Sequence, residues 1–297
     1  MGGAFFLERK GGVFYEGTRP VPKPGPGDLL VKIQAFALNP ADWKVQGVDF
    51  HLIKAYPTVV GADAAGDVEE VGEGVSGWEK GDRLCFEGIY GNDDRTAFQQ
   101  YALVPAQFAI KIPTKLSYEE AFTLPVAYTT AAMGLLAPAP IGAGLVNEDF
   151  EPLSDYSSSS ALVIGGAASY LGFKKIFTYA SGHHTLYLKS LGATDIIDRK
   201  TVSIDQLPDA ISKLTAGTGG DAPIKVVYNA VGSQETHDAG DKCLPDGQGQ
   251  SIVTVMGRVE TNFGRDSGKK LFAPVGIIQV PQYKDTGKRI VRVWRRG

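Results

Sequence analysis

The segment from Val59 to Leu84 constrains the fold of this 297-residue chain more than any other part of it. Val68, Val71 and Val75 alternate with acidic neighbours, a pattern typical of half-buried strands. Glycine occupies the positions where such strands must turn, because a positive φ angle costs it little: Gly61, Gly66, Gly72, Gly74, Gly77 and Gly81. These residues predict a small, barrel-like β fold.

Composition restricts the class of protein. With 43% hydrophobic and 21% charged residues, the chain is typical of a globular protein of two domains. A net charge of −3 gives no electrostatic reason to expect nucleic acid or a membrane surface as a partner. No apolar run reaches the ~18 residues that span a bilayer, and the N-terminus lacks a secretory apolar region. Cys85 and Cys243 lie far apart, which favours free thiols over a disulfide and predicts a cytoplasmic protein.

The character of the chain changes along its length. Residues 1–110 are rich in Gly, Pro and Val and predict many short strands. Residues 115–136 are helical in composition, with a capping box at Ser117 and Glu120 and a break at Pro125 that ends one helix and begins the next. Residues 137–160 are polar and predict a loop between domains.

From Ala161 onward, apolar strands alternate with helices. This order predicts a doubly wound parallel sheet of the α/β class that binds a nucleotide. The expected strands are ALVIGG, KKIFTYA, TDIID, IKVVYNAVG, SIVTVMG and GIIQV, and the expected helices are HHTLYLKSLGA and SIDQLPDAISKLTAG.

Several motifs resemble those of one known family. VVGADAAGDVEEVGEGVSGWEKGDRL closely resembles the G-x-D/E-x-x-G-x-V-x-x-V-G-x-G-V-x-x-[FW]-x-x-G-D-R-V block of the medium-chain dehydrogenase/reductase superfamily. LNPADWK resembles the LNP-x-D-x-K block of its zinc-independent quinone reductase and enoyl reductase branches, close to fungal toxin-cluster oxidoreductases. The resemblance implies a GroES-like β-barrel domain at residues 1–125 and a Rossmann-type NADP-binding domain at residues 126–297. It also implies an oxidoreductase that acts on a small-molecule substrate.

The zinc chemistry of other branches is not expected here. Gly61-Ala62-Asp63 stands where zinc-dependent members have Gly-His-Glu, and the chain has no cysteine cluster. Reduction of an activated C=C bond needs only a hydride and polarisation of a conjugated carbonyl. We therefore expect no metal, and a zinc alcohol dehydrogenase is the least favoured hypothesis.

The resemblance indicates three catalytic candidates. Asn39, Asp42 and Lys44 occupy the loop on the substrate side, and Lys44 is the natural donor to a developing enolate. The structural alternative is that Asn39 and Pro40 form a turn and that Asp42 caps a helix.

The cofactor candidates follow the strands of the second half. Gly165, Gly166, Ala167 and Ser169 resemble a phosphate-binding turn. NAD-binding enzymes usually have a carboxylate at the end of the second strand, and here Ser181 and His183 stand there instead. NADPH is therefore favoured over NADH. An ordinary solvated helix start explains His183 and His184 equally well. The resemblance adds two pairs of candidates. Thr129 and Thr130 would lie near the nicotinamide, and Val231 and Gly232 beside its ribose. The alternative for the two threonines is a hydroxyl hydrogen bond to a backbone carbonyl of their own helix.

Two departures from the family pattern leave activity open. Only Ala167–Phe173 separate the first strand from the second, whereas a crossover with a helix needs at least ~10–12 residues. Alternatively, ASYLGFKKIFTYAS forms the helix itself and the sheet loses its second strand. The chain also ends in or just after a helix, without the family's return to the catalytic domain.

Two hypotheses for function result. One is an NADPH-dependent, zinc-independent reductase of an enone, enoyl group or quinone. The other is a shortened, non-catalytic member that serves as a binding or oligomerisation module. GIIQV resembles the edge strand through which relatives form homodimers, although an ordinary buried strand fits it too.

Overall fold

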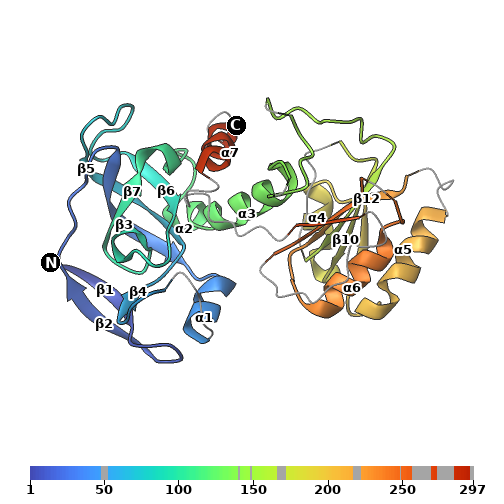
Figure 1. Ribbon diagram of the computed structural model, residues 1–297, viewed down its shortest axis with the longest axis horizontal. Helices are drawn as coiled ribbons and strands as arrows, with labels where there is room; N and C mark the ends of the chain where they lie inside the picture. The colour runs from blue at the N-terminus through green and yellow to red at the C-terminus, as the bar shows by residue number, and fades with distance from the viewer. Residues whose placement is uncertain are drawn as a thin grey trace. The chain divides into compact units, whose positions relative to one another are not determined.

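The computed structural model describes residues 1–47, 53–139, 141–147, 149–165, 172–216, 222–247, 249–255, 269–272 and 284–294. The chain divides into two compact units (Figure 1). The first comprises Met1–Thr129 with Gly276–Gly297, and the second comprises Thr130–Val275. The mixed α/β class predicted from the sequence is confirmed.

The first unit contains two antiparallel sheets. In the smaller one, β1 (Gly2–Leu7) lies between β2 (Phe14–Arg19) and β4 (Thr58–Val59). The larger one has the order β7 (Tyr101–Pro105), β3 (Asp28–Ala37), β5 (Asp63–Val71), β6 (Arg83–Glu87) and β8 (Ile110–Lys111). An Ala4–Gln99 bridge and a hydrogen bond from the Phe5 N–H to the Phe98 carbonyl link β1 to the segment before β7.

Two glycines of the Val59–Leu84 segment allow close packing. A Cβ on Gly66 would lie 2.2 Å from the Lys32 carbonyl oxygen, so only glycine lets β5 approach β3 here. Gly61 has a φ of +107°, and a Cβ on it would lie 2.4 Å from the Phe98 ring. Gly61 therefore fixes the position of Phe98 as well as turning the chain.

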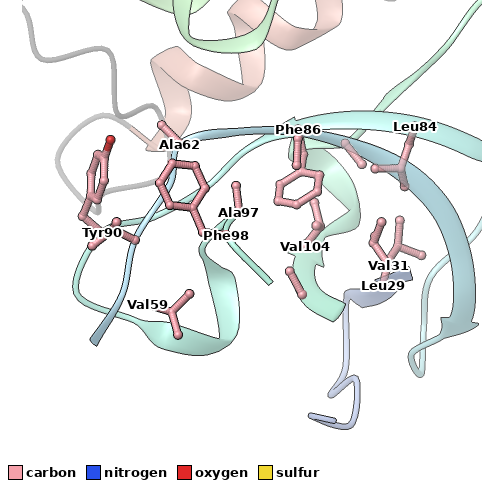
Figure 2. Packing of buried hydrophobic residues seen from close by; sticks show 14 of the residues in the cluster. Leu29, Val31, Val59, Ala62, Leu84, Phe86, Tyr90, Ala97, Phe98 and Val104 are labelled. Carbon is pink, nitrogen blue, oxygen red and sulfur yellow. The ribbon is translucent and has the colours of Figure 1, made fainter. Parts of the chain in front are cut away.

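The core of the first unit lies between its strands. Leu29, Val31 and Leu84 lie at one end of the cluster in Figure 2, and Ala62, Tyr90 and Phe98 lie at the other. Burial of these side chains supplies most of the driving force for folding this unit.

Short helices complete the first unit. They are α1 (Pro40–Gly47), η1 (Asp93–Arg95), η2 (Ala106–Phe108), α2 (Tyr118–Ala121) and α7 (Lys284–Trp294), and α3 (Pro125–Leu136) crosses the boundary between the units. The predicted capping box at Ser117 and Glu120 is confirmed, and α3 begins at Pro125 as expected. Pro40 opens α1, where its missing N–H costs nothing.

The C-terminal helix groups with the first unit, whereas the family resemblance assigned residues 126–297 to one nucleotide-binding domain. Ile290 and Val291 are buried, and α7 packs against η2. The contacts of α7 therefore lie with the β-rich unit.

The second unit contains a six-stranded parallel sheet. Its order is β11 (Asp195–Asp198), β10 (Lys175–Ala180), β9 (Ser160–Ile164), β12 (Ile224–Asn229), β13 (Ser251–Thr254) and β14 (Lys270–Phe272). In sequence order this reads 3-2-1-4-5-6, the order of a dinucleotide-binding sheet. Helices η3 (Gly182–His184), α4 (Thr185–Ser190), η4 (Ile204–Gln206), α5 (Leu207–Ala216) and α6 (Gln234–Cys243) connect the strands.

The shortened first crossover keeps its second strand. β9 ends at Ile164 and β10 begins at Lys175, and the two strands pair in parallel. The alternative, in which this segment forms a helix, is wrong, because Ile176 and Phe177 are buried residues of β10 between β9 and β11. β14 was not predicted, and GIIQV (276–280) lies outside the described residues.

No helix in the described parts of the chain is both long and apolar enough to span a bilayer.

Candidate active site

Three carboxyl groups are buried together in the first unit. They come from α1, β5 and β6: Asp42 is 4% exposed, Asp63 2% and Glu87 5%. Asp63 and Glu87 pair directly across β5 and β6, which places both on the same face of the sheet.

Asp42 is held by two donors. The Tyr90 hydroxyl donates to its Oδ1 at 2.6 Å, and the Asn39 backbone N–H donates to its Oδ2 at 2.6 Å. The second bond caps the first turn of α1, so the structural role considered for Asp42 is present. The first bond links the same carboxyl to a buried phenol.

Asn39 connects Asp42 to Asp63. Its side-chain Nδ2 donates to Asp63 Oδ2 at 3.0 Å, while the Val126 N–H donates to Asp63 Oδ1 at 2.8 Å. A primary amide carries two donors, and among the described residues only one of the two Nδ2 hydrogens has a partner.

Glu87 contacts the helix that enters the second unit. The Thr129 hydroxyl lies 2.9 Å from Glu87 Oε2 and 2.9 Å from the Pro125 carbonyl oxygen. A hydroxyl has one proton, and the carbonyl can only accept it. A protonated Glu87 that donates to Thr129 satisfies both contacts. The contact of the Thr129 hydroxyl with the Pro125 carbonyl is the hydrogen bond within the helix that was the structural alternative for Thr129.

Burial changes the protonation of this acid cluster, by which we mean Asp42, Asp63 and Glu87. Desolvation raises the pKa of Asp63 to about 7, against hydrogen bonds from Asn39 and Val126 that lower it. Desolvation also raises the pKa of Asp42, and it raises that of Glu87 well above its usual range. The cluster therefore holds protons near neutral pH.

Asn39 and Asp42 also line an apolar cavity of about 460 Å³ in the first unit. Most of its other lining residues are aromatic, among them Trp43 of α1. The Lys44 ammonium lies 5.9 Å from the centroid of the Trp43 ring. The three predicted catalytic residues thus lie at or near one cavity.

Within the described residues, no group of three or more His, Cys, Asp or Glu side chains is arranged to hold a metal ion. Cys85, on β6 beside the cluster, has a thiol pKa that burial raises, so the free thiol stays protonated near neutral pH.

The second unit brings two predicted cofactor positions together. Gly165 follows β9 with a φ of +90°, and a Cβ on it would lie 3.1 Å from the Val231 side chain. Gly165 and Val231 follow β9 and β12, between which the strand order reverses, and a dinucleotide binds at such a point. Asn229 Oδ1 accepts the Val231 and Gly232 N–H groups at 3.2 Å each and shapes this turn.

Two further features fit a ligand at this edge. The Thr254 hydroxyl, at the carboxyl end of β13, is buried and has no hydrogen-bond partner among the described residues. At the end of β10, Ser181 is half-buried and His183 is exposed. The residues present therefore fit a dinucleotide. Thr130 is half-buried at the start of the second unit, and Gly166, Ala167 and Ser169 lie outside the described residues.

One carboxylate near Ser181 was not anticipated. Asp198 ends β11, and backbone N–H groups of Lys200 and Gly182 lower its pKa. A Cβ on Gly182 would lie 2.5 Å from Asp198 Oδ2. A negative charge therefore lies beside the end of β10, although it comes from the neighbouring strand.

The comparisons agree with this architecture. A family model, the alcohol dehydrogenase GroES-like domain, matches residues 25–114. The trans-enoyl reductase tazE of Aspergillus terreus is 34% identical over 229 residues, which cover 71% of this chain and 73% of that protein. The chain belongs to the medium-chain dehydrogenase/reductase superfamily.

Solved structures share the fold of this superfamily member. A mycobacterial protein, Rv1454c, complexed with NADPH superposes with a TM-score of 0.74 at 22% identity, over 100% of this chain and 86% of that one. A quinone oxidoreductase from Pseudomonas syringae superposes with a TM-score of 0.72 at 20% identity, over 100% and 87% of the two chains. The sequence-based assignment to the enoyl reductase and quinone reductase branch is confirmed.

Sequence reasoning missed several residues of this superfamily member's site. The sequence motifs single out Asp63 only as a departure from Gly-His-Glu, and they do not point to Glu87, Tyr90, Asn229 or Asp198. Asp63 carried a signal, since an acidic residue stands within the apolar run VVGADAAG. The partners of Glu87 and Tyr90 come from distant segments, so no local pattern revealed them.

Proposed function

We propose that this superfamily member is an NADPH-dependent, zinc-independent reductase of an activated C=C bond or a quinone. The observation that carries the proposal is the placement of Asn39 and Asp42, which line one apolar cavity and join the acid cluster behind it. An amide donor and a proton-holding carboxyl are the two groups that conjugate reduction requires.

Asn39 polarises the substrate in this proposal. One Nδ2 hydrogen is held by Asp63, which fixes the amide, and the second is available to a substrate carbonyl oxygen. The amide takes the place of a Lewis acid and stabilises the negative charge that develops on that oxygen. Lys44, beside Trp43, adds positive charge near the cavity.

Asp42 and Tyr90 form the proton source. Their 2.6 Å hydrogen bond joins a carboxyl with a raised pKa to a buried phenol. When bound, the nicotinamide would supply a hydride, which together with one proton converts C=C to CH–CH or a quinone to a hydroquinone. Asp42 donates that proton to the substrate at the cavity and is then reprotonated through the acid cluster or from water.

The turns after β9 and β12 would hold the dinucleotide, with Gly165, Val231 and Gly232 nearest to it. Ser181 and His183 would serve a ribose 2′-phosphate, which is why we favour NADPH. The Asp198 carboxylate would repel that phosphate, and the proposal requires the contacts of Ser181 and His183 to outweigh this repulsion.

A second function has its own support. Residues 165–174, between β9 and β10, are too few for a strand crossover that includes a full helix. The N-terminus of that helix is where related sheets bind pyrophosphate. A chain without it would serve as a binding or oligomerisation module.

The deciding experiment is calorimetric titration of the purified chain with NADPH and with NADH, followed by an assay with an enone and a quinone. We expect saturable NADPH binding, which Ser181→Ala weakens and Ser190→Ala, a serine at the end of α4, leaves unchanged. Tighter NADH binding would overturn the NADPH assignment. If the folded chain binds neither NADPH nor NADH, the result would support the non-catalytic function instead.

A further inference from the structure

Another cavity of the first unit differs in chemistry from the one beside Asn39. This hollow, the Glu16 cavity, has a volume of about 170 Å³ and is lined by β1, β2, β3 and the segment before β7. Its wall shares two rings with the larger, aromatic cavity beside Asn39: Phe5, which is 44% exposed, and Phe36, which is 36% exposed. A ligand anchored in the Glu16 cavity therefore has apolar surface next to it on which its body can lie.

The hollow forms where β1 and β3 depart from an ordinary pair of strands. Gly3 has no side chain, and a Cβ on it would lie 3.4 Å from Cδ of the Gln100 side chain. The pairing of β3 with β5 shifts register between Ile33 and Ala35. Gly3 and Phe5 are two residues apart on β1 and share one face of it. The missing side chain at Gly3 leaves space on the face that carries Phe5.

The charge of this cavity comes from one residue. Glu16 is the only charged side chain among the described residues that line it, and this side chain is exposed. Glu16 stands directly opposite Phe5 in the antiparallel register of β1 and β2. Residues opposite each other on two strands point to the same face, so the carboxylate and the ring are neighbours.

No cation of the described residues lines the cavity to neutralise Glu16. Arg19 donates to Oε1 of the lining residue Gln99 at 2.7 Å, but the same guanidinium is paired with Asp94 at 2.6 Å. The Lys44 ammonium lies beside Trp43, which lines the larger cavity and not this one. The Glu16 cavity is therefore anionic.

Its amide side chains add more acceptors than donors. Gln34 Nε2 donates to Asp67 Oδ2 at 2.8 Å, which leaves Gln34 Oε1 as an acceptor without a partner among the described residues. Gln100 Oε1 accepts the Gly3 N–H at 2.9 Å, which leaves its Nε2 as a donor. With the two oxygens of Glu16, three acceptor atoms face one donor.

We propose that the Glu16 cavity binds the primary ammonium group of an organic amine, with the Glu16 carboxylate as counter-ion and Gln34 Oε1 as a second acceptor. An ammonium group carries three donors and no acceptor, which matches this set. An exposed ion pair alone adds little affinity. The Phe5 and Phe36 rings supply the rest, because aromatic faces attract cations and the apolar body of the amine covers exposed rings.

Three probes of one shape test the charge preference. They are phenylbutylamine, which is protonated at neutral pH, phenylbutanol, which is neutral, and phenylbutyrate, which is anionic. Binding is measured by calorimetry and, independently, by saturation-transfer NMR. We expect saturable binding of the amine, with the alcohol about fivefold weaker and the carboxylate weaker still. Added salt should weaken binding of the amine and not of the alcohol. Equal affinity for amine and alcohol, or no saturable binding of the amine, would overturn the proposal.

Variants locate the ammonium group. Glu16→Gln should reduce the affinity for the amine to that for the alcohol, and Glu16→Lys should reverse the preference toward phenylbutyrate. Glu70→Gln removes the same charge from an exposed position of β5 and should leave amine binding unchanged. Circular dichroism of each variant shows that it is folded. If Glu16→Gln binds the amine like the native chain, the ligand lies elsewhere and the proposal is wrong.

A further variant tests the aromatic wall. Phe5→Ala should weaken the amine and the alcohol by the same factor of about five, because both lose the same ring. Unchanged binding of both would show that the body of the ligand does not lie on Phe5. No nicotinamide enters these experiments, so the proposal stands or falls independently of the proposed reductase function.

Discussion

At the scale of single residues, Gly61 has a double role. Its φ of +107° suits glycine alone, and the space that a side chain would need is filled by the Phe98 ring. Phe98 in turn lines the apolar cavity beside Asn39. A turn residue and a cavity wall are therefore coupled through one missing Cβ.

We predict that Gly61→Ala destabilises the first unit by about 2–3 kcal/mol, because strain at positive φ adds to the clash with Phe98. Urea unfolding followed by tryptophan fluorescence measures this. Gly74→Ala is the matched control, since its φ of +74° is also positive but a Cβ there meets open space. Equal losses in the two variants would show that Phe98 is not packed as described.

Asp63 predicts a pH dependence of stability. Its pKa is raised from 3.8 to about 7, so between about pH 4 and pH 7 the unfolded carboxyl is ionised while the folded one keeps its proton. The folded state then binds more protons, and the free energy of unfolding falls as pH rises through this window, by about 4 kcal/mol in total. Asp42 and Glu87 act in the same direction.

Asp63→Asn should flatten this profile and make the chain more stable than the native protein at pH 8. Urea midpoints at several pH values test it. Glu70→Gln, at an exposed position on the same strand, should follow the native profile. A native-like slope in Asp63→Asn would place the titration elsewhere.

At the scale of elements, α7 attaches the end of the chain to the β-rich unit. Ile290 is 1% exposed. We predict that Ile290→Ala costs about 2–4 kcal/mol, because the cavity left behind adds to the lost burial. Tryptophan-detected unfolding is the measurement, and Asp285→Asn, on the exposed side of α7, is the control. A loss below 0.5 kcal/mol would mean that α7 is not packed on this unit.

The sheet of the second unit shows that hydrophobic periodicity alone cannot distinguish a buried strand from a helix. The apolar residues of KKIFTYA fit a helical stripe and a buried strand equally well, and only pairing with β9 and β11 decides for the strand. A parallel strand buried on both faces carries no alternation that would distinguish it.

At the scale of the whole molecule, the two units have separate cores. The cluster around Leu29 and Phe86 lies within the first unit, and those around Phe177 and around Leu145 lie within the second. All three tryptophans, Trp43, Trp78 and Trp294, fall in the first unit.

We predict that urea unfolding followed by tryptophan fluorescence does not coincide with unfolding followed by far-ultraviolet circular dichroism, which reports both units. The clusters formed by the described residues of the two units share no side chains, so we do not expect both to unfold at one denaturant concentration. Coincident curves with a single slope would show that the units unfold as one.

The sequence by itself determined what depends on local pattern. Glycine spacing predicted the β-rich unit, Ser117 and Glu120 the capped helix, and the alternation after Ala161 the parallel sheet, because φ preferences, capping and burial periodicity act over a few residues. The motifs were also enough to identify the superfamily.

Only the tertiary structure decided the acid cluster and the aromatic cavity. Asp63 meets Asn39 and Val126, Tyr90 meets Asp42, and rings from five segments line one cavity, all through contacts between residues far apart in the chain. The pKa of a carboxyl depends on its burial and its partners, and both are set by packing rather than by neighbours in sequence. The same residues that look like turns and caps in the sequence become a proton-holding site once the sheets bring them together.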